Sequence, residues 1–173
     1  MVIWLTGLSG SGKSTVNTIL QKMLAKKKVK TIFLDGDSIR EIYGNDLNFT
    51  ESNRKIQIKR IQNLAKFFYK DKRVVLVSAL YSSDSLLIRN RKIFKKYYEV
   101  YLKTPISILR KRDIKNLYNP ALKGKIKNVV GIDIKWNEPK NPNLIFDQTK
   151  KISPNKIAKT ILDKIYEKYK FKF

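Results

Sequence analysis

The feature that most constrains this chain is the nine-residue segment Gly7-Leu8-Ser9-Gly10-Ser11-Gly12-Lys13-Ser14-Thr15. It fits the pattern G-x-x-x-x-G-K-[ST], a loop that joins a strand to a helix and cradles phosphate groups. The glycines allow the tight turn that brings consecutive N–H groups to phosphate oxygens. Lys13 is expected to reach the β- and γ-phosphates, and the Ser14 hydroxyl to bind Mg²⁺.

The segments on either side of this loop support the phosphate-binding interpretation. The apolar run Val2–Thr6 precedes it and is typical of a buried strand. Ser14–Lys26 follows, with apolar residues at helical spacing. The alternative, a flexible Gly/Ser turn, does not require this strand–loop–helix order. A helix that begins at the loop would add the positive end of its dipole to the phosphate site.

Strand and helix patterns alternate along the rest of the chain. We expect strands at 2–6, 31–34, 73–78, 97–102 and 143–146, and helices at 14–26, 50–70, 85–94, 105–112 and from 154 onward. Such alternation predicts an α/β fold with three layers, a mostly parallel five-stranded sheet carrying helices on both faces. We expect residues 1–173 to form one domain, in which the irregular polar segment at about 113–133 is a lid.

Composition excludes several kinds of chemistry. The chain has no cysteine and no histidine, which rules out disulfides, thiol nucleophiles and histidine-based catalysis. Catalysis must therefore use carboxylates, lysine, arginine, hydroxyls and a metal bound by oxygen. No apolar run approaches the ~20 residues needed to cross a bilayer. Met1 leads directly into the first expected strand, without a signal-peptide pattern, so we expect a cytoplasmic protein with no membrane partner.

The net charge of +24 raises a second hypothesis, a protein that binds nucleic acid. The basic residues are scattered, however, and no DNA- or RNA-binding motif surrounds them. We favour a chain biased toward lysine, with much of its charge on solvated helix faces. We therefore expect no specific nucleic-acid partner.

A second group of candidate residues follows the strand expected at 31–34. Asp35, Gly36 and Asp37 come directly after it, with Arg40 close behind. Ligands of parallel sheets bind beyond the carboxyl ends of the strands, so this group and the phosphate loop should share one rim. A carboxylate there can orient Mg²⁺ or accept a proton from an attacking hydroxyl. The alternative is an ordinary solvated turn.

Two further clusters combine cations with aromatic side chains. Phe49, Arg54, Gln57, Lys59 and Arg60 form one; the other is the segment 112–118 with Lys123, Lys125 and Lys127. An arginine fork can bind phosphate and an aromatic ring can stack on a base. Cations in a lid can close over a transferring phosphoryl group. The alternatives are a basic helix face and a solvated basic loop.

Six short motifs occur in order along the chain: the phosphate loop, Asp35-Gly36-Asp37 with Arg40, Asp46-Leu47-Asn48-Phe49-Thr50, Glu99-Val100-Tyr101, Arg112-Asp113 with Lys115, Leu117 and Tyr118, and Gly131-Ile132-Asp133. Together they resemble the adenylylsulfate (APS) kinase family over essentially the whole chain. The resemblance implies an adenylate-kinase-like P-loop kinase fold and a homodimer. It also implies transfer of the ATP γ-phosphate to the ribose 3′-hydroxyl of a nucleoside 5′-phospho mixed anhydride.

The resemblance also implies roles for particular residues. ATP and Mg²⁺ would be bound by the phosphate loop, with Arg112 beside ATP and with Ser14 and Asp37 as metal ligands. Asp37 would be the catalytic base and Lys13 the catalytic cation. The acceptor nucleotide would contact residues of the rim, the aromatic cluster and the lid: Asp35, Arg40, Phe49, Arg54, Gln57, Lys115, Leu117 and Ile132.

The sequence departs from the family pattern around the acceptor. The family's D-R-x-E-N-I-R-R is here Asn53–Arg60, so that Gln57 replaces an asparagine, and Val129 replaces a phenylalanine that helps to sandwich adenine. A family serine with a phosphoserine role falls in 79–83, where we assign no phosphoserine. We favour the branch tied to capsule decoration, whose acceptor is cytidine 5′-diphosphoramidate; the alternative is adenylyl-sulfate kinase in sulfate assimilation. A basic nucleic-acid-binding protein is the distant third hypothesis.

Overall fold

A computed structural model describes residues 1–81, 83–113 and 115–170 of the chain. Ser82, in the segment aligned with the family's phosphoserine, and Ile114, in the expected lid, lie outside the described residues. None of the described helices combines the length and the apolar character needed to cross a membrane.

The centre of the structure is a five-stranded sheet with the strand order β2-β3-β1-β4-β5. The strands are β1 (Val2–Thr6), β2 (Thr31–Asp35), β3 (Val74–Ala79), β4 (Tyr97–Lys103) and β5 (Leu144–Asp147). Every neighbouring pair is parallel. β1 is buried along its whole length because β3 and β4 flank it and helices cover both of its faces. This confirms the expected α/β fold.

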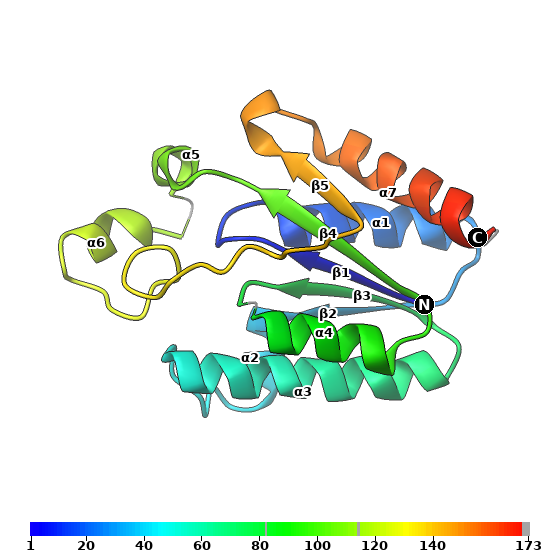
Figure 1. The fold of residues 1–173 in the computed structure, drawn as a ribbon, viewed down its shortest axis with the longest axis horizontal. Helices are drawn as coiled ribbons and strands as arrows, with labels where there is room; N and C mark the ends of the chain where they lie inside the picture. Colours follow the sequence, from blue (N-terminus) through cyan, green and yellow to red (C-terminus); the bar gives the residue numbers. More distant parts are fainter. Residues whose placement is uncertain (82, 114, 171–173) are drawn as a thin grey trace.

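Seven α-helices are described: α1 (Lys13–Lys26), α2 (Gly36–Ile42), α3 (Glu51–Lys70), α4 (Asp84–Ile93), α5 (Ile106–Arg112), α6 (Tyr118–Leu122) and α7 (Pro154–Tyr169). A 3₁₀ turn, η1 (Gln148–Lys150), follows β5. Figure 1 shows α1 and α7 on one face of the sheet and α3 and α4 on the other. α5 and α6 lie beyond the carboxyl ends of the strands (Figure 1).

Two of these helices were not expected from the sequence. α2 occupies a segment rich in Asp and Gly for which we predicted no helix. It forms because the Asp35 carboxylate accepts a 3.0 Å hydrogen bond from the Asp37 N–H and thereby caps a helix. α6 lies inside the irregular segment.

The register of the sheet brings the ends of the central strands to one level. Thr6 at the end of β1 pairs with Ala79 of β3 and with Tyr101 of β4. Asn17 of α1 donates a 2.9 Å hydrogen bond to Ser78 of β3 and so ties the helix to the sheet just below this edge. The segments that follow β1, β2, β3 and β4 therefore meet at one rim, as expected for parallel strands.

Candidate active site

The phosphate loop turns sharply between β1 and α1. Gly7 has a φ of +152°, and a Cβ atom there would lie 2.7 Å from the carbonyl oxygen of Leu102, so no larger residue fits without displacing β4. Gly12 has a φ of +94° at the start of α1, which also favours glycine. The N–H groups of Gly10 and Gly12 donate to no acceptor within the described chain, and so they are free to bind an anion.

Lys13 closes this loop from the inside. Its Nζ donates to the carbonyl oxygens of Gly7 and Leu8, each at 2.9 Å, and the residue is only 9% exposed. Burial lowers the pKa of Lys13 to about 8, while the nearby carboxylate of Asp35 acts in the opposite direction. The ammonium is thus held in the loop, poorly solvated, where a phosphate would supply the missing negative charge.

The Ser14 hydroxyl is next to a carboxylate. It donates a 2.6 Å hydrogen bond to Asp35 Oδ2, whereas Asp37 is exposed and forms an ion pair with Lys115. Ser14 and Asp35 are oxygen donors of the kind that Mg²⁺ prefers, but the described residues hold no group of three or more protein ligands of the His, Cys, Asp and Glu types. A magnesium ion here would therefore depend on water and phosphate oxygens, as is usual for this metal.

Phe49 and two arginines form a wall beside α2 and α3. The guanidinium carbons of Arg40 and Arg54 lie 4.7 Å and 5.3 Å from the centroid of the Phe49 ring, which is 52% exposed. Arg40 is buried and donates to the carbonyl oxygen of Leu47 at 2.9 Å. Arg54 Nε donates to the Phe49 carbonyl oxygen at 2.8 Å. An exposed ring held between cations suits a nucleotide, which has both a base and phosphates.

The same wall is tied to other parts of the site. Arg54 Nη2 donates a 2.7 Å hydrogen bond to the carbonyl oxygen of Asn128, and Gln57 Nε2 donates to the Gly36 carbonyl oxygen at 3.0 Å. Gln57 is 4% exposed, and its Oε1 has no hydrogen-bond partner among the described residues. Two members of the predicted cluster stay apart from it. Lys59 points to solvent, and both outer nitrogens of Arg60 bind the Asp46 carboxylate.

The expected lid contacts Asp37, the core and the phosphate loop. Lys115 is paired with Asp37, and Leu117 packs against the core. Tyr118 of α6 is buried and donates a 2.9 Å hydrogen bond from its hydroxyl to the carbonyl oxygen of Ser9 in the phosphate loop. Arg112, the residue expected beside ATP, is exposed at the end of α5, and its side chain makes no hydrogen bond or ion pair with the described residues.

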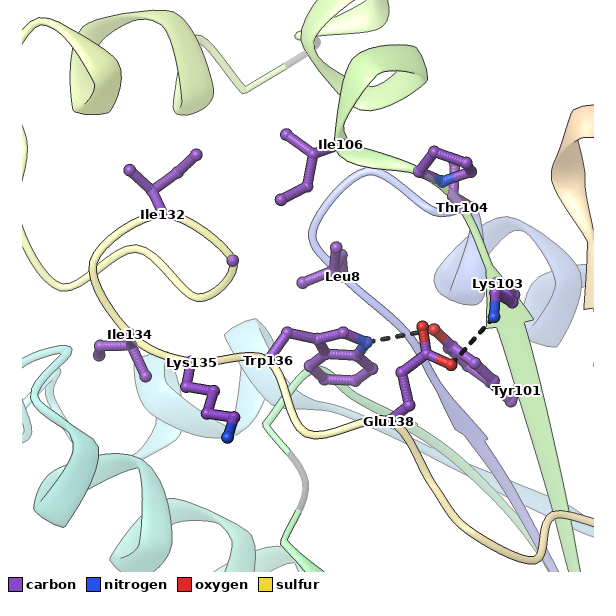
Figure 2. Close-up of a pocket in the computed structure, with 12 residues that line it drawn as sticks. Leu8, Tyr101, Lys103, Thr104, Ile106, Ile132, Ile134, Lys135, Trp136 and Glu138 are labelled. Carbon is purple, nitrogen blue, oxygen red and sulfur yellow. Dashed lines mark hydrogen bonds and ion pairs between the residues drawn. The ribbon is translucent and has the colours of Figure 1, made fainter.

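Ile132 lines a pocket of about 380 Å³ that the sequence did not predict. The segment 131–138 forms one side of it, and Leu8 of the phosphate loop and Ile106 of α5 form another (Figure 2). Trp136 Nε1 donates a 3.1 Å hydrogen bond to the hydroxyl of Tyr101 at its edge. The signals in the sequence were the Gly131-Ile132-Asp133 motif and a tryptophan within a polar, irregular segment.

The structure thus brings together most of the predicted site residues in two groups at one rim. The phosphate loop, Asp35 and Asp37 form the first group; Arg40, Phe49, Arg54 and Gln57 form the second. Of the lid residues, Lys115 is exposed and pairs with Asp37 of the first group, and Leu117 packs against the core. Within the described residues, the Arg112 side chain has no hydrogen bond or ion pair with either group.

Comparison with known proteins gives one consistent result. The family model of adenylylsulphate kinase matches residues 1–147. A curated adenylyl-sulfate kinase of Bacteroides thetaiotaomicron is 37% identical over 174 residues, covering 97% of this chain and 86% of the relative. One from Bacillus velezensis is 38% identical over 151 residues, covering 86% and 77%.

Solved structures agree with the sequence comparisons. The Mycobacterium tuberculosis APS kinase CysC in complex with AMPPNP and APS superposes with a TM-score of 0.88 at 32% identity, covering 95% of this chain and 96% of that one. A shikimate kinase from Aquifex aeolicus, at 20% identity and a TM-score of 0.60, shares the fold. The chain therefore belongs to the adenylylsulphate kinase family of phosphotransferases, which act on a hydroxyl group of a nucleotide.

Proposed function

We propose that this protein is an adenylyl-sulfate kinase, which transfers the γ-phosphate of ATP to the 3′-hydroxyl of adenylyl sulfate. The observation that carries this proposal is the likeness to the M. tuberculosis enzyme in complex with AMPPNP and APS, which extends over 95% of the chain. The two groups of side chains at the rim agree with it. One is suited to phosphates, and the other offers a ring and arginines to a nucleotide.

On the donor side, the loop N–H groups and Lys13 would hold the β- and γ-phosphates of ATP. The full set of loop residues in this proposal is Gly7, Ser9, Gly10, Ser11, Gly12, Lys13, Ser14 and Thr15. Mg²⁺ would neutralise charge on the β- and γ-oxygens. Ser14 supplies a hydroxyl ligand, and Asp35, through its 2.6 Å contact with that hydroxyl, is better placed than Asp37 to orient the metal's water. Asp37 remains the second candidate ligand.

On the acceptor side, Asp37 would accept the proton of the attacking hydroxyl. It is exposed, and Lys115 binds its Oδ2, so displacement of the ammonium would make the carboxylate a stronger base. Lys115 would then be free to turn toward the transferring phosphoryl group, where a cation stabilises developing charge. Because Lys115 belongs to the lid, its movement from Asp37 to the phosphoryl group would make the activation of the base depend on the lid.

The wall formed by Arg40, Phe49 and Arg54 would supply further contacts with the acceptor. Arg40 and Arg54 would bind the phosphosulfate, and Phe49 would stack on the base. Asp35, Gln57, Leu117 and Ile132 complete the set that we propose for the acceptor, with Arg112 beside ATP. The segment 113–133 would act as the lid of a single domain, and we extend the proposal to a homodimer that works in the cytoplasm.

The base of the acceptor is where two of our hypotheses differ. The relatives named above support adenylyl sulfate over cytidine 5′-diphosphoramidate. The argument for cytidine came from Val129, but this side chain is 2% exposed and packs in the core, so its size is a weak guide to a bound base. A role in capsule decoration therefore has less support than one in sulfate assimilation. A nucleic-acid-binding protein without catalysis has the least support.

The proposal is tested by measuring ADP release with ATP, Mg²⁺ and adenylyl sulfate. We expect turnover with adenylyl sulfate and none with its 3′-deoxy analogue, which lacks the accepting hydroxyl but keeps the base, phosphate and sulfate. Equal ADP release with the two compounds would contradict transfer to the 3′-hydroxyl. No release with either compound would contradict the proposed activity.

A further inference from the structure

The contact between α6 and the phosphate loop joins residues that are far apart in the chain. The Tyr118 hydroxyl donates to the Ser9 carbonyl oxygen at 2.9 Å across a sequence separation of 109 residues. The Tyr118 side chain is buried, with the residue only 2% exposed. Burial raises the pKa of Tyr118 to about 12, so its hydroxyl carries its proton and is a donor at physiological pH.

The Ser9 carbonyl belongs to the same planar peptide unit as the Gly10 N–H. In a trans peptide the C=O and N–H bonds point in opposite directions. A hydroxyl that holds the Ser9 oxygen on the α6 side therefore turns the Gly10 N–H away from α6. That N–H has no acceptor in the described part of the chain, and Gly10 has a φ of +75°, which leaves the peptide easy to rotate without such a contact.

The orientation of Tyr118 is itself fixed from the start of α6. The Asp113 carboxylate accepts hydrogen bonds from the N–H groups of Leu117, Tyr118 and Asn119, at 2.8 Å, 3.1 Å and 3.1 Å. One carboxylate thus sets the first turn of the helix that carries the tyrosine. Lys115, which pairs with Asp37, lies between Asp113 and Tyr118 in the sequence.

We propose that Tyr118 is a positioning residue, which orients the Ser9–Gly10 peptide so that the Gly10 N–H faces the phosphates of the donor nucleotide. The lid then contributes to the phosphate cradle before any acceptor is present. The inference rests on the proposed function only in taking the bound anion to be a nucleoside triphosphate. It concerns the donor site, whichever nucleotide accepts the phosphate.

The first test is Tyr118→Phe, which removes one hydroxyl and keeps the ring. We expect the dissociation constant of Mg²⁺·AMPPNP, measured by calorimetry, to rise about three- to tenfold. In steady-state kinetics, the KM for ATP should rise while the KM for adenylyl sulfate stays within about twofold. The matched control is Tyr169→Phe, since the Tyr169 hydroxyl also donates to a backbone carbonyl, that of Tyr97 at 2.7 Å, away from the loop. Its nucleotide affinity should not change.

The second test needs no ligand. In ¹H–¹⁵N spectra of the free protein, Tyr118→Phe should shift the Gly10 resonance, and Tyr169→Phe should leave it in place. An unmoved Gly10 resonance, or unchanged AMPPNP affinity in Tyr118→Phe, would overturn the inference. Wild-type protein that fails to bind AMPPNP would instead contradict the proposed function, and the Gly10 resonance would still decide the role of Tyr118.

Discussion

The two halves of the site are built in different ways. Lys13 holds the phosphate loop through contacts to residues no more than six positions away in the chain, and the contacts of Ser14 with Asp35 and of Ser9 with Tyr118 add to this local framework. The acceptor side depends on distant partners: Arg54 reaches Asn128 across 74 positions, and Lys115 reaches Asp37 across 78. A local structure can be specified by a short motif, whereas a structure made from distant contacts can change with any one of its partners.

This difference explains why the donor is better defined than the acceptor. The phosphate loop would bind the polyphosphate of a nucleotide largely through its own backbone and Lys13. The acceptor wall uses side chains from α2, α3 and the loop between them, Arg54 also binds the Asn128 carbonyl oxygen in the segment after α6, and the Phe49 ring is exposed. We therefore expect donor-side changes to abolish the reaction and acceptor-side changes to alter KM.

The largest effect should come from Lys13→Ala. Removing the buried ammonium deletes the cation on the transferring phosphoryl group, and we expect kcat to fall about 10³-fold. ADP release measures the loss, and circular dichroism shows whether the fold survives. Lys22→Ala, an exposed lysine on the same helix, should keep wild-type activity. If a folded Lys13→Ala protein kept more than a few percent of wild-type kcat, the claim that phosphoryl transfer needs Lys13 would be wrong.

Arg54→Ala should mainly affect the acceptor. The change removes a charge next to the proposed phosphosulfate and also the hydrogen bond to Asn128, so the KM for adenylyl sulfate should rise about 30-fold. The KM for ATP should change less than about threefold. Arg73, a partly exposed residue whose side chain pairs with the nearby Asp71, provides the control Arg73→Ala. Equal losses on the two substrates would show that the halves are not separable.

Phe49→Ala should have a smaller effect on the same side. Loss of stacking on a base costs about 1–3 kcal/mol, and we expect the KM for the acceptor to rise about tenfold. Phe67→Ala removes another exposed ring, on the distal part of α3, and serves as the control. An unchanged acceptor KM in Phe49→Ala would mean that the base binds elsewhere.

The smallest effect is a dependence of donor binding on pH. The pKa of Lys13 is lowered to about 8 in the free protein, mainly by burial, and bound phosphates should raise it. AMPPNP affinity should therefore be constant below that pKa and fall above it, by about fourfold between pH 7 and pH 8.5. In Lys13→Arg the guanidinium stays charged, so the profile should be flat over this range. A flat wild-type profile would contradict a lowered pKa for Lys13.

The same contrast separates what the sequence could predict from what it could not. The strand–loop–helix unit around Lys13 was predictable because apolar periodicity and a local motif specify it. α2 was not, because aspartate and glycine form turns as well as caps, and only the contact of the Asp35 carboxylate with the Asp37 N–H decides between them. In α3, Ile58 shares the buried face of Ile61 because it lies three residues before it, whereas Ile56 lies five residues before Ile61 and is exposed.

Long-range contacts carried no signal in the sequence. Nothing in their spacing indicates that Lys115 pairs with Asp37, or that the Tyr118 hydroxyl lies on the Ser9 carbonyl oxygen. The pocket lined by Trp136 and Leu8 depends on how the segment after α6 folds back against the loop. The burial of Val129 likewise depends on that packing. Because the side chain is buried, its residue type is weak evidence for a cytidine acceptor.

The central claim, transfer to the 3′-hydroxyl of adenylyl sulfate, is tested most directly by competition. One reaction contains ATP, Mg²⁺ and equal concentrations of adenylyl sulfate and cytidine 5′-diphosphoramidate, and mass spectrometry of the products gives the ratio of the two kcat/KM values. We predict that 3′-phosphoadenylyl sulfate forms in an excess of at least about a hundredfold. A product mixture dominated by phosphorylated cytidine 5′-diphosphoramidate would contradict the account.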